Sequence, residues 1–164
     1  MRRSCVEFEE FARAEWPALR RTAFWLSGDW HTAEDLAQAT LMKVYARWWT
    51  LRRPARAAAF ARTTLTRTWI DWQRKRSTGE VPAEYVADRP VDDSDVPLRH
   101  ALLAALAALP AVQRAVVVLR YWEDLPVEEV ARLVGRKTAT VRSDAARGLA
   151  ALRETLAEKG AVTW

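Results

Sequence analysis

The chain has 164 residues, half of them hydrophobic, which suffices for one ordinary domain or two small ones and argues against global disorder. The formal net charge of +5 points weakly to a polyanionic partner, and the scarcity of glycine beside abundant Ala, Leu, Arg and Glu favours helices. A single cysteine, Cys5, excludes an intramolecular disulfide, and with only His31 and His100 besides it a Cys/His zinc site is excluded as well.

No targeting or membrane segment is predicted. The first ten residues carry three glutamates where a signal peptide would have an apolar core. The most apolar run, 101–119, is interrupted by Pro110, Gln113 and Arg114, so it is not expected to span a membrane. We therefore expect a cytoplasmic protein without membrane insertion.

Apolar residues recur at helical spacing from Val6 to Leu26 and predict a first helix, which 27–29 (Ser-Gly-Asp) interrupt. Thr32 is expected to cap the next helix, with Asp35 three residues later as in a capping box. That helix is long and amphipathic. It is expected to end at 52–54 (Arg-Arg-Pro), because the residue before proline disfavours helix.

A third helix is predicted from about Ala57 to Arg76, with several threonines that are unusual in a helix interior. The segment 43–76 holds ten basic residues and one acid, Asp71. Near its end, "WIDWQRKR" places Trp69 and Trp72 directly before three cations. Two interpretations stay open: both indoles pack inward above a solvated basic face, or the segment binds nucleic acid through phosphate contacts and base stacking.

Residues 80–95 reverse the charge, with six acids against Arg89 and with interspersed prolines. Few apolar residues occur there, so the segment reads as an exposed acidic linker between two helical lobes. We place the lobes at 5–76 and 98–159 and the linker at 77–97.

The second lobe begins with two short helices, one ending at Pro110 and the next running from Val112 to Tyr121. The following segment, 124–154, has the layout of a helix-turn-helix: Pro126 suits a first turn, and Gly135 can close the first helix in the left-handed conformation. The second helix should begin near Thr138 or Ala139.

The second helix of this motif has two chemically distinct faces. An apolar stripe is formed by Val141, Ala145, Leu149 and Leu152, and the opposite face carries Lys137, Thr140, Arg142, Ser143 and Arg147. A DNA-recognition helix needs this division between an anchored face and a face aimed at the major groove. A plain helical hairpin with a solvated basic face is the alternative.

Together these segments resemble bacterial sigma factors of the sigma-70 family, of the short extracytoplasmic-function type and its sigma-E-like subfamily. The resemblance rests on "AEDLAQ" within 29–48, on "FARTTLTRTWIDWQRKR" at 60–76 and on "DLPVEEVARLVG…TVRS" in the last third. It implies an all-α fold with a sigma-2-like bundle and a sigma-4-like helix-turn-helix domain joined by a flexible acidic linker. It also implies a factor that binds core RNA polymerase and recognises −10 and −35 promoter elements.

The resemblance assigns residues to each surface. Polymerase binding falls to Asp35, Gln38 and Leu41, although Leu41 could equally be a core residue. Binding of −10 DNA falls to Arg62, Arg67, Trp69, Trp72, Arg74, Lys75 and Arg76. Of the two tryptophans, one is expected to pack inward with Ile70 and the other to lie near DNA, and the alternative is that both belong to the core. Binding of −35 DNA falls to Arg136, Lys137, Thr138, Thr140, Arg142, Ser143 and Arg147. In the family the linker also enters the RNA path of the polymerase; a plain solvated tether is the alternative.

Four positions depart from the family pattern. Arg67 stands where an asparagine often helps to read the −10 element, and Ala39 replaces a common glutamate of the docking helix. Arg136 and Lys137 occupy turn positions that are more often apolar and small polar, respectively. These departures bear on specificity and on the packing of the turn.

Three other classes of protein share parts of this sequence pattern. A stand-alone helix-turn-helix regulator would bind duplex DNA unaided, but its sensing domain would rarely need ten cations against one acid. An enzyme is disfavoured because the sequence has no glycine-rich phosphate loop, GxSxG or HExxH motif. A helical adaptor would bind no nucleic acid. We expect a non-enzymatic sigma factor without cofactor or metal, whose partners are core polymerase and promoter DNA. Factors of this type are often held by an anti-sigma factor, which the resemblance implies as a further partner.

Overall fold

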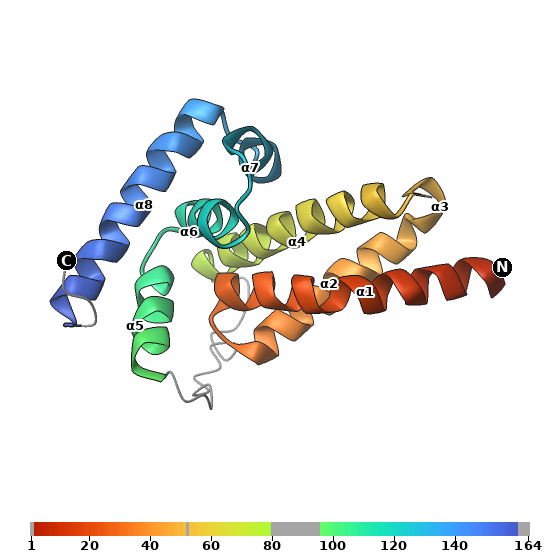
Figure 1. The fold of residues 1–164 in the computed structure, drawn as a ribbon, viewed down its shortest axis with the longest axis horizontal. Helices are drawn as coiled ribbons and strands as arrows, with labels where there is room; N and C mark the ends of the chain where they lie inside the picture. The colour runs from red at the N-terminus through yellow and green to blue at the C-terminus, as the bar shows by residue number, and fades with distance from the viewer. Residues whose placement is uncertain (1, 52, 80–95, 161–164) are drawn as a thin grey trace.

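The computed structural model describes residues 2–51, 53–79 and 96–160, and all regular elements in these ranges are helices. The first lobe consists of α1 (Arg2–Ser27), α2 (Trp30–Ala46), the single turn α3 (Trp48–Leu51) and α4 (Pro54–Ser77). In Figure 1, α1, α2 and α4 run alongside one another as a bundle. The acidic linker and its proposed path lie outside the described residues.

The turn between α1 and α2 corrects the expected cap. Asp29, not Thr32, is the N-cap of α2, and its carboxylate Oδ1 accepts a hydrogen bond of 2.8 Å from the backbone N–H of Thr32. Gly28 precedes it with φ +89°, a conformation that glycine adopts without strain. The left-handed turn therefore starts α2 two residues before Thr32, so Thr32 lies inside the helix.

The end of α2 also differs from the expectation. The helix stops at Ala46 rather than at 52–54, and α3 forms a separate turn before Pro54. Pro54 is the first residue of α4, where its missing N–H has no intrahelical partner to lose. The proline thus starts the next helix three residues earlier than predicted.

The second lobe contains α5 (Val96–Ala107), α6 (Ala111–Val117), the π-helical turn η2 (Val118–Trp122), α7 (Val127–Val134) and α8 (Thr138–Glu158). The predicted helix-turn-helix is confirmed in α7 and α8. Gly135 closes α7 with φ +69°, and the N–H of Arg136 reaches back to the carbonyl of Ala131 at 3.0 Å. This wrapped C-terminus turns the chain directly into α8.

The two lobes share a hydrophobic core. One cluster of buried side chains includes Leu65 and Trp69 of α4 together with Leu106 of α5 and Val117 of α6. A second cluster joins the helix-turn-helix to α6 and η2, with Leu133 of α7 packed among Val116 and Leu119. The lobes are thus packed against each other, which the sequence pattern did not predict.

Three threonines of α4 form hydrogen bonds through their hydroxyl groups. Thr63 and Thr66 donate their hydroxyls to the carbonyls of Ala59 and Arg62, both at 3.0 Å. Thr68 accepts a hydrogen bond of 2.9 Å from the ammonium group of Lys43. Because these three hydroxyls have partners, small polar residues are tolerated in a helix that neighbouring helices cover on more than one side.

Arg114 of α6 joins the lobes by capping α1. Its Nε and Nη2 donate to the carbonyl of Trp25 at 3.2 and 3.0 Å, and the residue is only 6% exposed. That carbonyl lies in the last turn of α1, where helical carbonyls lack an intrahelical donor. Burial lowers the pKa of Arg114 to about 10, so the guanidinium is still charged at neutral pH.

Candidate nucleic-acid interface

The C-terminal end of α4 presents three adjacent cations to solvent. Arg74, Lys75 and Arg76 are exposed and occupy its last turn, where positive charge also complements the helix dipole. Asp71 offsets only one of them, at 3.6 Å from Arg74. This end of α4 therefore offers positive charge to a phosphate backbone.

The two tryptophans of α4 have different environments. Trp69 is 1% exposed, so of the two indoles it is the one that packs inward. It continues a ladder of buried residues at four-residue spacing, Ala57, Ala61 and Leu65, which turns it into the core. Trp72 lies one turn on at the edge of this ladder and is half-buried.

Trp72 lines a groove of about 490 Å³ between α2 and α4. Asp35, Gln38 and Met42 contribute from α2, and Arg76 lies at the α4 side. The structure thus brings two predicted polymerase-binding residues together with two predicted DNA-binding residues. Met42 is 73% exposed and gives the groove an apolar rim.

Leu41, the third predicted polymerase-binding residue, lies apart from this groove. It is half-buried, packs against the core and lines a neighbouring hollow with Phe8 and Tyr45. Its side chain therefore has both a core contact and a surface contact, so both sequence interpretations stay open.

The outer face of α8 is polar and accessible. The predicted apolar stripe is buried at Val141, Ala145 and Leu152, whereas Leu149 is half-buried. On the opposite side Thr140 is exposed, and Thr138 and Ser143 are half-buried. The four cations of this side are also exposed: Arg136, Lys137, Arg142 and Arg147. From a helix in the major groove, these side chains can contact phosphate groups or base edges.

Local contacts order part of this face. Arg147 donates to the hydroxyl of Ser143 at 3.2 Å, one helical turn away. Arg142 lies 3.9 Å from the carboxylate of Glu128, and both side chains are largely exposed. Exposed ion pairs of this kind hold a side chain only weakly, so Arg142 remains available to another anion.

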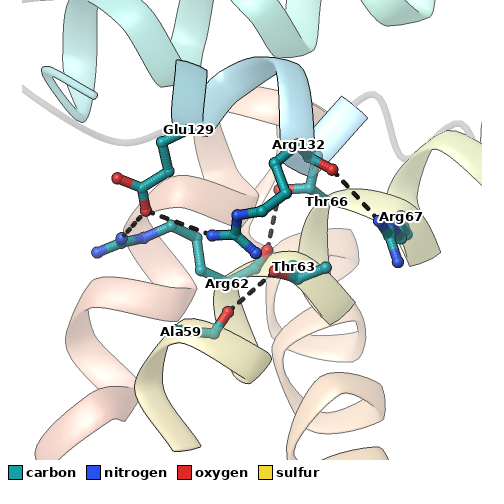
Figure 2. Close-up of polar contacts among 7 residues, drawn as sticks. All are labelled: Ala59, Arg62, Thr63, Thr66, Arg67, Glu129 and Arg132. Carbon is teal, nitrogen blue, oxygen red and sulfur yellow. Dashed lines mark hydrogen bonds and ion pairs between the residues drawn. The ribbon is translucent and has the colours of Figure 1, made fainter. Parts of the chain in front are cut away.

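The middle of α4 holds a contact that the sequence did not reveal. Arg62 donates to Glu129 Oε1 of α7 at 3.0 Å, and Arg67 donates to the backbone carbonyl of Arg132 at 3.2 Å (Figure 2). Both arginines were predicted to contact DNA, and both are engaged by the second lobe. No local sequence signal pairs them with α7, because the partners are more than sixty positions away.

One exposed aromatic residue was also missed. Trp49 of α3 is 64% exposed and lies between α2 and α4 in the chain, close to the exposed Arg53. An exposed indole beside a cation is suited to stack on a base. The sequence signal for it is the pair Trp48-Trp49 followed by two arginines, 52 and 53.

In the described ranges, no His, Cys, Asp or Glu residues gather in the groups of three or more that could hold a metal ion. Among the same residues, every helix is too short or too polar to cross a membrane.

Family models match both lobes. Residues 11–78 match the model described as sigma-70 region 2, and residues 99–152 match the model described as sigma-70, region 4. Together the two matches cover most of the chain, and each coincides with one lobe.

Individual relatives match over nearly the full length. The RNA polymerase sigma-E factor of Streptomyces coelicolor is 40% identical over 155 residues, which cover 92% of this chain and 86% of the relative. The sigma-E factor of Streptomyces avermitilis is 41% identical with the same coverage. Among solved structures, the sigma factor RpoE from Bartonella quintana, crystallised with the anti-sigma factor NepR, has a TM-score of 0.73 at 30% identity. That match covers 92% of this chain and 96% of the other.

Proposed function

The chain belongs to the sigma-70 family of RNA polymerase sigma factors, in the extracytoplasmic-function group, and we propose that its two basic helix surfaces divide promoter recognition between them. As a sigma factor it directs promoter-specific transcription initiation. The observation that supports the division is the presence of two separate basic faces, on α4 and α8, in one short chain.

In the first lobe, the α4 surface binds the −10 element. The exposed Arg74, Lys75 and Arg76 hold the backbone independently of sequence, and Arg62 and Arg67 extend the basic face when α7 leaves them. Opening DNA requires unstacking, and stacking on an aromatic ring returns about 1–3 kcal/mol per base. Trp72 and Trp49 are the aromatic residues of this lobe placed to contribute, whereas Trp69 supports α4 from within.

In the second lobe, α8 binds the −35 element. Its N-terminal half carries Thr138, Thr140, Arg142, Ser143 and Arg147, which enter the major groove as duplex DNA is read. In the turn before it, the exposed Arg136 and Lys137 add phosphate contacts. This assigns the two turn positions that depart from the family pattern to affinity rather than to base selection.

The groove between α2 and α4 binds core polymerase. Asp35 and Gln38 supply polar groups, Met42 supplies an exposed apolar surface, and Leu41 extends the contact on the neighbouring side. The polymerase then performs the chemistry in the cytoplasm, and this chain acts without a cofactor or catalytic residues of its own.

The functional units have the boundaries 5–76 and 98–159, with 77–97 as the connection. Like the Bartonella relative, the chain is held by an anti-sigma factor when it is not bound to polymerase. Both statements are supported by the family relationship and by the agreement of the lobes with the two matched regions.

Reconstitution tests the proposal. Purified protein is added to sigma-free bacterial core polymerase, and transcription starts are mapped on a pooled genomic promoter library. Discrete starts that depend on the chain, with shared −10 and −35 sequences upstream, are expected. Specific duplex binding by the free chain without any dependent start would instead favour the stand-alone regulator.

A further inference from the structure

Helix α7 lies across the middle of α4, on the side where the basic face begins (Figures 1 and 2). The carboxylate of Glu129 lies 3.0 Å from Arg62 of α4 and 3.9 Å from Arg132 of its own helix. Arg67, five residues beyond Arg62, donates to the carbonyl of Arg132. Two of the guanidinium groups on the α4 face are thus occupied by oxygen atoms of the second lobe.

The chemistry of this contact resembles that of a nucleic-acid contact. A guanidinium group binds carboxylate and phosphate oxygens with the same donors and similar geometry, so one arginine cannot serve both fully. We propose that Glu129 is an internal competitor for nucleic acid, which engages Arg62 in the middle of the α4 face until the two lobes separate. The proposal rests on the proposed function in taking α4 as a nucleic-acid surface.

Other contacts hold α7 in this position. Thr22 of α1 donates to the carboxylate of Glu123 at 2.6 Å, just after η2. The rings of Trp25 and Trp122 lie 5.0 Å apart, and Arg114 caps α1 from α6. The Arg62–Glu129 pair is therefore part of a larger contact between the lobes and not an isolated surface ion pair.

The closure is selective. The terminal cations of α4 and the polar face of α8 remain exposed, and α8 packs on α5, α6 and α7 on the outer side of the second lobe (Figure 1). The free chain is thus expected to offer its α8 face to duplex DNA while the α4 face binds single strands only through its end. The two halves of promoter recognition become available at different stages.

Neighbouring glutamates of α7 supply a matched pair of variants. Glu129→Gln removes the charge that faces α4, whereas Glu128→Gln removes the same charge one residue earlier. Both glutamates lie in the first turn of α7, so each substitution removes the same favourable interaction of a negative charge with the helix N-terminus. Glu128 is 72% exposed and faces Arg142 of α8 rather than α4.

Two readouts are taken on the full-length free chain. The first is its affinity for a short fluorescein-labelled single-stranded DNA of mixed sequence, and the second is amide hydrogen exchange in peptides of α4 and α7. Because a single partly exposed ion pair is removed, we expect Glu129→Gln to bind about threefold to fivefold more tightly. The amide hydrogens of α4 and α7 should also exchange faster in Glu129→Gln. Glu128→Gln should show the same exchange as the parent, and its affinity for the single strand should rise only as much as the change in net charge accounts for.

Equal behaviour of the two variants overturns the proposal. A gain in affinity without faster exchange, or faster exchange without a gain, overturns it as well, because contact and competition would then be uncoupled. The double variant Glu123→Gln/Glu129→Gln removes a second contact between the lobes and should enlarge both effects. Circular dichroism confirms that each variant is folded before its result is used.

A separate variant isolates the proposed function. Lys75→Ala/Arg76→Ala removes cations that lie outside the α7 contact. If this variant binds the single strand as tightly as the parent, α4 is not a nucleic-acid surface and the proposed −10 role fails. If it binds more weakly while the two glutamine variants remain alike, the −10 role stands and only the competition by Glu129 fails.

Discussion

Helices α4 and α8 carry the same sequence pattern but differ in how accessible it is. Each has an inner side of apolar and small residues and an outer side with cations. The outer side of α8 is free of contacts with the first lobe, whereas in the middle of α4 Arg62 and Arg67 are held by contacts to α7 and stay partly exposed. A basic amphipathic helix therefore defines where nucleic acid could bind, but its neighbours decide when that surface is free.

The difference follows from the position of each helix in the fold. α4 contacts α1 and α2 within its own lobe and α6 and α7 of the other lobe. α8 packs mainly on helices of the second lobe through its inner stripe, where Gly148 lies close to Val117. A helix enclosed by two lobes loses part of its outer side, and a helix at the edge keeps it.

The largest expected effect is a loss of stability that differs between the inner and outer sides of α4. Trp69→Ala should lower the free energy of unfolding by about 3–5 kcal/mol, because a fully buried indole leaves a cavity. Trp72→Ala should lower it by less than half as much, since that ring is half-buried in the groove. Urea denaturation of both variants measures the difference. Equal losses would mean that the two rings are equivalent and that the assignment of Trp72 to the surface is wrong.

Arg114 tests the coupling between the lobes. Arg114→Met should lower the free energy of unfolding by about 2 kcal/mol, because the buried carbonyl of Trp25 loses a charged donor. Arg120→Met serves as the control, since Arg120 donates to the carbonyl of Leu125 within the second lobe. Scanning calorimetry of thermal unfolding should show separate transitions for the two lobes in Arg114→Met and a single transition in the control.

The pH dependence of this contribution has a definite sign. Burial lowers the pKa of Arg114 to about 10, so above about pH 10 the folded chain releases a proton that the unfolded chain still retains. In that window the Arg114 titration alone raises stability as pH rises; below it, both states are protonated. The stability difference between the parent and Arg114→Met should therefore be constant between roughly pH 6 and 9. A difference that changes across neutral pH would contradict this assignment.

The open face of α8 is tested by duplex affinity. Arg147→Ala should weaken binding of the free chain to duplex DNA severalfold and lower the slope of log affinity against log salt by about one. Lys159→Ala removes the same charge at the C-cap of α8, beyond the polar face, and should change the slope less. Fluorescence anisotropy across a salt series measures both. Identical slopes would mean that the face contributes only net charge.

The smallest expected effect concerns the turn that aims α8. Gly135→Ala should lower the free energy of unfolding by about 1 kcal/mol, because φ +69° strains a residue with a Cβ. The added methyl meets no atom within 4 Å, so backbone strain is the only penalty. Urea denaturation gives the value, and a loss of several kcal/mol would show that the turn is packed more tightly than the structure indicates.

Local sequence signals predicted the helices correctly but placed some helix ends at the wrong residues. Gly135, Pro110 and the apolar spacing act within a few residues, so the helix-turn-helix was predicted with its turn in the correct place. Thr32 was mistaken for the cap because Asp29 and Thr32 both have a side-chain oxygen, and the turn at Gly28 decides which one is used. Pro54 was taken as an end because proline disfavours the residue before it, although it also suits a helix start.

The sequence by itself determined the all-α class, the two basic faces and the family resemblance, because helical periodicity and charge are properties of neighbouring residues. Only the tertiary structure decided that Trp69 is buried and that Glu129 faces Arg62, since these depend on how the second lobe packs against α4. Contacts between residues more than sixty positions apart leave no periodic trace in the chain. For this protein, the sequence thus identifies the surfaces that can bind, and the packing of the lobes decides which of them is open.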